Sequence, residues 1–355
     1  MPRDLLSLLA VQVLRWSDKG RSCRKLLSCR ACHATEVGIT VLLVVLFCSS
    51  PALADTFGLG TAGPGNWGIL ETGANQVSIS GPGGGITLNP GATAGQANLG
   101  INSGGKLNAS SGTIPGTYYK FTGNSDSGSS SGTIASTTVS SAAGNATLAT
   151  AASNATTASA NLAGLTPNQT FAAVIATSTT INATVPGENV VNLLLGINLG
   201  NGTTLTLNGS ASQSFVINIP AGGITLGSAS ILLTGGLTPA NVIFNVTGGQ
   251  NVSLNGAGGV INGIVMDLAG MVSLTNNNTI FGEVISGTSI SMSNNSDVEA
   301  VQTVPEASTT AFFTLGPLSL LAVVLLYRRF SRRKQAVVGR SHDPPESVLD
   351  VTKSG

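Results

Sequence analysis

The chain has 355 residues, of which 9% are charged, 4% are aromatic and 46 are glycine. Ordinary globular chains carry about 25% charged residues, so this composition is unlike that of a cytosolic enzyme. The glycines follow no three-residue period, which excludes a collagen triple helix. The hydrophobic content of 42% is too high for a chain that stays unfolded for want of residues to bury.

The charged residues are concentrated at the two ends of the chain. Residues 55–327 contain nine acidic residues, and their bases are Lys106 and Lys120 alone. Without a basic surface this part is not expected to bind nucleic acid. It also has no Arg, His or Cys, which excludes a Ser-His-Asp site, a thiolate nucleophile and a His/Cys metal site. We therefore expect no cofactor and no metal.

Residues 1–54 have the features of a basic extension followed by a secretory signal peptide. The uncharged run from Val37 to Phe47 has eleven residues, and Ala52 and Ala54 form a small-x-small cleavage site before Asp55. The alternative is a short membrane anchor, but the run is well below the roughly 20 residues that span a bilayer.

Residues 55–135 alternate short apolar pairs with turn formers, which predicts short strands. Within residues 139–165, Leu148, Ala151, Ala155, Ala158 and Leu162 follow helical spacing. This stripe of small residues predicts a helix packed closely on a flat surface. The alternative is a low-complexity linker.

Residues 173–301 contain a repeat with three short apolar patches in each copy. Val272, Leu274 and Asn276 map onto Ile290, Met292 and Asn294, one repeat later; Gly263, Val265 and Met266 map onto Gly282, Val284 and Ile285. Phe244, Val246, Val252 and Leu254 map in the same way onto Ile264, Met266, Val272 and Leu274. A period of about 20 residues is typical of one turn of a β-helix, whose turns must stack to form a core.

We therefore predict an all-β fold for residues 55–301, a parallel β-helix (β-solenoid) with one long helix packed alongside; a β-sandwich is the alternative. Val252, Leu254, Val272, Leu274, Ile290 and Met292 are expected inside. Asn255, Asn276 and Asn294 are expected to form a ladder at one corner.

The middle of the chain resembles two bacterial families. The stretches NGTTLTLNG from Asn201, SFVINI from Ser214 and GGLTPANVIFNVTG from Gly235 are similar to repeats of the choice-of-anchor A surface proteins. The order of a few strands, a helix and then the main repeats is similar to the ice-binding-like adhesins. That resemblance implies a β-helix with one long helix along it.

Residues 302–334 are predicted to be a sorting segment. Val304, Pro305 and Glu306 precede an uncharged helix over 309–327, long enough to cross a membrane once. The basic cluster that follows places residues 55–310 outside the cytoplasm and the tail, 335–355, inside as a disordered segment: Arg328, Arg329, Arg332, Arg333 and Lys334.

The layout of this segment resembles the PEP-CTERM tag of exopolysaccharide-producing bacteria. The resemblance implies recognition by an exosortase-type membrane protease. Ala307 departs from the usual second proline, and the tail is longer than such tags have. A permanent single-span anchor therefore stays the alternative.

Four carboxylates are candidates for catalysis or cation binding. A glycoside hydrolase needs two carboxylates at matched separation. Asp267 and Glu283 are separated by close to one repeat, so we expect them to be stacked neighbours on one face. Asp297 and Glu299 are expected to cap the last turn of the solenoid. The alternative for Asp267 and Glu283 is two solvated positions on an acidic surface, and we expect no catalytic residues.

An ice-binding protein needs a flat, regular and mostly uncharged face. Six threonines lie in the repeats without recurring at one fixed place: Thr203, Thr204, Thr206, Thr225, Thr275 and Thr288. The main hypothesis is therefore a non-enzymatic, exported structural or adhesive protein of the bacterial cell surface or extracellular matrix, with polysaccharide or ice as its extracellular partner. An ice-binding protein is the alternative, followed by a polysaccharide-active enzyme.

Overall fold

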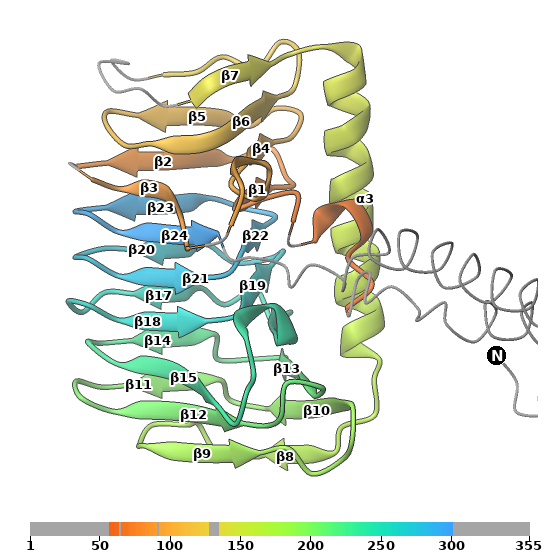
Figure 1. Cartoon of the computed structure of the whole chain (residues 1–355), viewed down its shortest axis with the longest axis vertical. Helices are drawn as coiled ribbons and strands as arrows, with labels where there is room; N and C mark the ends of the chain where they lie inside the picture. The colour runs from red at the N-terminus through yellow and green to blue at the C-terminus, as the bar shows by residue number, and fades with distance from the viewer. Residues whose placement is uncertain (1–56, 64, 82, 91, 128–134, 301–355) are drawn as a thin grey trace, which may run out of the picture. The chain divides into compact units, whose positions relative to one another are not determined.

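The computed structural model describes residues 57–300, except for 64, 82, 91 and 128–134. This part of the chain winds into a three-sided solenoid (Figure 1). Its sides are sheet A with ten strands and sheets B and C with seven strands each. Neighbouring strands in each sheet run parallel, which confirms the predicted β-solenoid and excludes the β-sandwich.

The strands follow one another through each sheet in the following spatial order. Sheet A consists of β7 (Ala135–Val139), β6 (Ile114–Lys120), β4 (Leu99–Ile101), β1 (Ile69–Glu71), β22 (Val284–Ser286), β19 (Ile264–Asp267), β16 (Val242–Val246), β13 (Ser214–Ile219), β10 (Glu188–Leu193) and β8 (Gln169–Phe171). Sheet B consists of β5 (Lys106–Ala109), β2 (Gln76–Ser80), β23 (Ile290–Ser293), β20 (Val272–Leu274), β17 (Val252–Leu254), β14 (Ile224–Leu226) and β11 (Ile197–Leu199). Sheet C consists of β3 (Gly85–Leu88), β24 (Asp297–Ala300), β21 (Thr279–Phe281), β18 (Val260–Asn262), β15 (Ser230–Thr234), β12 (Thr204–Asn208) and β9 (Thr179–Asn182). Short 3-10 turns lie at η2 (Gly60–Ala62), η3 (Ala94–Gln96) and η4 (Pro239–Asn241).

The first strands in the sequence stack on the last ones. β1, β2 and β3 pair with β22, β23 and β24, so the first strands of the described residues lie in the middle of the stack. It builds outward to β7, returns along the outside of sheet A, and then winds from β8 back to β24 (Figure 1). The sequence had indicated strands in both regions but not this junction, because paired residues such as Ile69 and Val284 are far apart in the chain.

The interior of the solenoid is filled by one aliphatic cluster. All six side chains predicted to lie inside are fully buried: Val252, Leu254, Val272, Leu274, Ile290 and Met292. Burying such aliphatic side chains contributes about 1.5–3 kcal/mol each. The turns of the solenoid are therefore held together by stacked rows of apolar side chains.

The corner between sheets B and C is formed by asparagines in left-handed conformation. Asn276 and Asn294 have φ angles of 63° and 53°, which Asn tolerates better than most residues. Asn294 donates from Nδ2 to Oδ1 of Asn276 at 3.1 Å, and Asn276 donates to the carbonyl of Asn255 at 3.2 Å. This is the predicted corner ladder.

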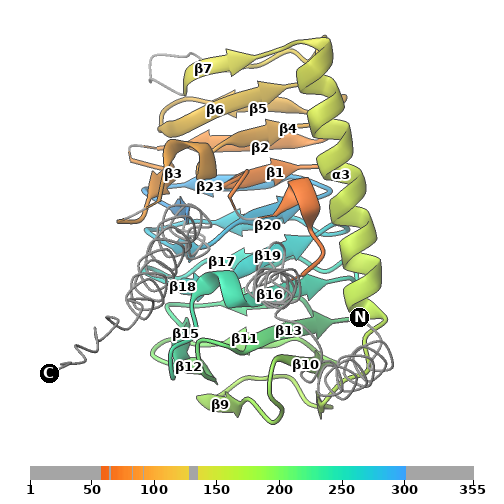
Figure 2. The ribbon, with the colours of Figure 1, turned by 45° about the vertical axis from the view of Figure 1, so that its right-hand side comes forward.

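The predicted helix is present as α3 (Ala142–Ala163), which follows the outside of sheet A (Figure 2). The Ser141 side chain accepts a hydrogen bond from the Gly144 N–H at 3.1 Å and so begins the helix. The predicted stripe from Leu148 to Leu162 is buried in a second apolar cluster with outward side chains of sheet A, including Val216, Ile243 and Ile285. Small alanines bring the helix close to the sheet, and the linker alternative is wrong.

Two polar contacts fix α3 along the sheet. Asn245 of β16 donates to the Ser159 carbonyl at 3.0 Å and accepts from the Ser159 hydroxyl at 2.7 Å. Asn218 of β13 donates to the Leu162 carbonyl at 2.7 Å. These asparagines are buried, so the contacts satisfy groups that would otherwise be costly under the helix.

One predicted register is wrong by one residue. Phe244 lies opposite Val265 and Asn245 opposite Met266, so Phe244 and Val246 do not align with Ile264 and Met266. β16 and β19 are buried on both faces, so they lack the alternation that fixes a register. The mappings of Val265 onto Val284 and of Val272 onto Ile290 are confirmed.

Three predicted segments lie outside the described residues: the extension and signal peptide (1–54), the sorting segment with its membrane helix (302–334) and the tail (335–355). Among the helices that the structure does describe, none is both long and apolar enough to cross a bilayer.

Candidate functional site

The three sides of the solenoid differ in what covers them. Helix α3 buries the outer side of sheet A along much of its length (Figure 2). Sheets B and C have no such cover within the described residues, and their outward side chains are partly or fully exposed. A surface that meets a large external partner must therefore be sought on sheets B and C.

Sheet B carries a row of hydroxyl side chains at one register position. Ser78, Ser291, Ser273 and Ser253 occupy four adjacent strands and lie opposite one another in that order. We call these four residues the serine ladder. The row continues to Thr225 and Asn198 in one direction and to Asn108 in the other. Seven consecutive strands thus present a small uncharged polar group at the same place.

The buried residues before and after each serine hold the serine ladder at one fixed register. Each serine stands between two buried aliphatic residues, as Ser273 does between Val272 and Leu274. The pairs from β5 to β11 keep an uninterrupted parallel register. Adjacent side chains in the row are therefore about 4.8 Å apart, the spacing of strands in a sheet.

The hydroxyl groups of the serine ladder are available to solvent. Within the part of the chain that the structure describes, none of these four hydroxyls donates or accepts a hydrogen bond, and each residue is partly exposed. A second row runs beside it through Ser80 and Ser293, which lie opposite each other. Sheet B thus presents a hydroxyl-rich outer surface on a regular parallel backbone, with Gln76 and the exposed Lys106 beside the end of the row on β2 and β5.

Sheet C is far less regular. Its outward positions mix threonines and asparagines with Val260, Phe281 and Leu232, and Leu232 is 42% exposed. Asp297 and Glu299 also point outward from β24. The two faces therefore differ in chemistry: sheet B repeats one small polar group, and sheet C does not.

The carboxylates do not assemble as the sequence suggested. Asp267 and Glu283 are both fully buried, but Asp267 ends β19 at the corner between sheets A and B. Glu283 directly precedes Val284, which lies opposite Val265. It therefore lies where the strands of sheet A begin, at the corner between sheets C and A, whereas Asp267 lies where they end. Asp267 and Glu283 are therefore not stacked neighbours on one face.

The second carboxylate pair does not cap the solenoid, because β3 pairs with β24 on the side away from β21. Burial and the neighbouring Glu299 raise the pKa of Asp297 to about 6, and burial also raises the pKa of Glu299. The described residues contain no group of three or more His, Cys, Asp or Glu that could hold a metal ion.

The sequence-predicted processing residues cannot be located in the fold. Ala52 and Ala54, Val304 to Glu306, and the cluster from Arg328 to Lys334 all lie outside the described residues. The serine ladder, in contrast, was missed. Its signal in the sequence is a serine between two apolar residues at one repeat position, as in V-S-L around Ser253 and Ser273 and I-S-M around Ser291; threonines do not recur in this way.

A family model described as ice-binding-like matches residues 82–298. The chain belongs to the ice-binding-like family. The match includes α3 and all strands from β3 to β23. No curated protein is similar enough to this ice-binding-like chain to count as a match.

Several solved structures are similar to this ice-binding-like chain. An ice-binding protein (LeIBP) from an Arctic yeast is 19% identical with a TM-score of 0.46, covering 70% of this chain and 95% of its own. One from the Antarctic ascomycete Antarctomyces psychrotrophicus is 19% identical with a TM-score of 0.45, covering 69% and 98%. A domain from Shewanella frigidimarina is 18% identical with a TM-score of 0.44, covering 69% and 96%.

Proposed function

We propose that the protein binds ice through the outer face of sheet B. The observation that carries this proposal is the uncharged row from Asn198 to Asn108, with the serine ladder at its centre. Membership of the ice-binding-like family favours this function over the matrix role that was the main hypothesis from the sequence. The family is named for binding ice and not for a reaction.

The geometry of sheet B suits a crystalline partner. A crystal face offers many weak contacts at fixed spacing, so a binding surface gains most when its own groups are already fixed. The serine hydroxyls stand on strands whose backbones are held on both sides by parallel pairing. They can hold water molecules in ordered positions, with little further entropy to lose.

A bulky residue in the centre of the serine ladder should abolish ice binding. We expect Ser273→Tyr to lose thermal hysteresis and retention on ice, because the ring would hold the flat face away from the crystal. Ser273 points outward, so the melting temperature of the variant should change little. The measurements are thermal hysteresis, partition onto a growing ice surface, and thermal unfolding.

The matched control is Thr206→Tyr on sheet C, which also replaces an outward residue between two buried leucines. This variant should bind ice as the parent does. If Ser273→Tyr binds ice normally, the proposal for sheet B is wrong. If Thr206→Tyr alone loses ice binding, sheet C is the binding face.

We further propose that the solenoid is exported and then processed at its C-terminal side. The support is the signal-like segment ending at Ala54 and the sequence from Val304 to Lys334. We expect Glu306→Ala to stay in the inner membrane, while the parent is released or moved to the cell surface by an exosortase-type protease. Fractionation of cells with and without that protease measures this.

A parent protein that stays in the inner membrane with residues 335–355 attached would instead indicate a permanent anchor. The adhesive matrix role and the polysaccharide partner stay predictions from the sequence.

A further inference from the structure

We propose that two copies of this chain associate end to end, through the turn of the solenoid that contains β8 and β9. We call this end the β9 end; the strands at the opposite end are β7, β5 and β3. The proposal goes beyond ice binding and does not depend on it, because the β9 end is a different surface from the outer face of sheet B.

The strands at the β9 end have one free edge each. β9 pairs with β12 and β8 pairs with β10, and among the described residues neither has a partner on its other side (Figure 1). The Ala183 N–H donates to the Asn208 carbonyl at 2.8 Å. Because alternate residues of a strand face opposite neighbours, the N–H and C=O of Thr180 point to the free edge.

The β9 end lacks the charged residues and the edge proline by which proteins often protect a free edge. Edge strands are commonly guarded by charged residues, by proline or by a covering segment. Residues 166–187 contain no charged residue, and neither proline of this stretch lies in β9. The Gln169 side chain donates a hydrogen bond to the Asn182 carbonyl at 2.9 Å. The backbone N–H and C=O of Thr180 have no such partner among the described residues.

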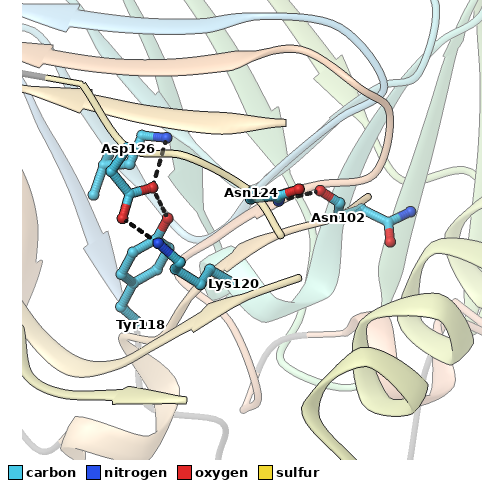
Figure 3. A network of polar contacts seen from close by, with 6 residues as sticks. Asn102, Tyr118, Lys120, Asn124 and Asp126 are labelled. Carbon is cyan, nitrogen blue, oxygen red and sulfur yellow. Dashed lines mark hydrogen bonds and ion pairs between the residues drawn. The ribbon is translucent and has the colours of Figure 1, made fainter. Parts of the chain in front are cut away.

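The opposite end is protected by both a covering segment and charge. Ser127 forms a bridge with Asn108 of the edge strand β5, and its N–H donates to the Leu107 carbonyl at 2.9 Å. Asp126 in this covering segment forms an ion pair with Lys120 at 2.8 Å (Figure 3). It also accepts a hydrogen bond from the Tyr118 hydroxyl at 2.8 Å.

Lys106 adds an exposed charge on β5, the edge strand of sheet B at this opposite end.

An exposed apolar patch lies next to the β9 end, at the corner between sheets A and B. Val174, Leu194 and Leu195 are 40%, 38% and 53% exposed. They belong to adjacent turns, because Leu194 N–H donates to the Phe171 carbonyl at 3.0 Å and Ile175 N–H to the Gly196 carbonyl at 3.1 Å. Three of the six large hydrophobic side chains exposed in the described part of the chain are gathered here.

These features fit a second copy related by a two-fold axis. In a three-sided solenoid, the corner between sheets A and B lies opposite sheet C. An axis from the middle of β9 to this corner brings β9 against its own copy in antiparallel direction and the apolar patch against itself. Thr180 would then exchange both backbone hydrogen bonds with its copy, the pattern of an antiparallel pair. Head-to-tail stacking would instead place the β9 end against the opposite end, which is covered and charged.

The oligomeric state of the full chain tests this proposal. We expect dimers when the purified protein is kept in detergent micelles and measured by sedimentation equilibrium or light scattering over a series of concentrations. The double variant Val174→Glu/Leu195→Glu should be monomeric, because it places charges on the patch. Thr180→Pro should also be monomeric, because it removes an N–H that has no partner within one copy.

The control Leu232→Glu changes a leucine of sheet C that is 42% exposed and should remain dimeric, and all four proteins should show similar thermal unfolding. A monomeric parent at every concentration would overturn the proposal. So would a dimer that persists in both the double variant and Thr180→Pro. If only Thr180→Pro loses structure, the double variant still decides the question.

Discussion

Replacing Leu274 by Asp is expected to unfold the solenoid. Leu274 is completely buried in the interior cluster, between Leu254 and Met292 on the neighbouring strands. Deleting a buried leucine costs about 2–5 kcal/mol by itself, and a carboxylate without a partner adds a further penalty for burial. Since domains are stabilised by only about 5–15 kcal/mol, Leu274→Asp should lose cooperative unfolding and the circular dichroism of the native sheets.

Ser273→Asp is the matched control, because it introduces the same side chain at the adjacent position. Ser273 points outward, and substitutions at such surface positions usually change stability by about 0.5 kcal/mol or less. A folded Leu274→Asp variant with the stability of the parent would show that the inward assignment of Leu274 is wrong. Equal damage by both variants would place both side chains in tightly packed surroundings.

Where a strand is solvated on one side, the sequence determines its register. In sheet B, Val252 and Leu254 were matched correctly to Val272 and Leu274, because the serine between each pair marks the outer side. In sheet A, every residue of β16 is buried, since α3 covers the outer side. The sequence there shows no alternation of apolar and polar residues, and Phe244 was matched to a residue one position away from its true neighbour.

The helix was predictable for the same physical reason. Its buried residues form one continuous stripe from Leu148 to Leu162, and the opposite side carries exposed alanine, threonine, serine and asparagine. The junction between β1 and β22 could not be predicted, because the contact depends on stacking of whole turns and not on a local pattern. The candidate site was only partly predictable: the absence of charge was visible, but the alignment of Ser78 with Ser291 depends on that junction.

Two buried carboxyl groups at the corner between sheets A and B are expected to make stability depend on pH. Glu71 and Asp267 lie on either side of Ser286 in sheet A, and all three are fully buried. Glu71 accepts hydrogen bonds from the N–H groups of Gly73 at 2.9 Å and Asn75 at 3.3 Å. Asp267 accepts one from the Gly270 N–H at 2.7 Å.

One oxygen of each carboxyl group, Oε2 of Glu71 and Oδ2 of Asp267, has no hydrogen-bond partner among the described residues. Loss of solvent raises the pKa of Glu71 from 4.5 to about 7, although hydrogen bonds from the backbone oppose this. Burial likewise raises the pKa of Asp267 from 3.8 to about 6. In the folded state both groups therefore keep a proton that the unfolded chain releases at lower pH.

The free energy of unfolding should therefore be highest in mild acid. It should fall as pH rises from the pKa that each carboxyl group has in the unfolded chain to the higher pKa that it has in the folded protein. Because one pKa unit corresponds to about 1.4 kcal/mol, Glu71 alone should lower it by roughly 3 kcal/mol between pH 4.5 and 7. Glu71→Gln keeps a side-chain oxygen for the Gly73 N–H and cannot ionise, so its stability should vary less with pH. Denaturant unfolding across this range measures the slope, with Glu188→Gln as an exposed control that should behave as the parent does. A parent whose stability rises with pH over this interval would show that the two carboxyl groups are charged and compensated in the folded protein.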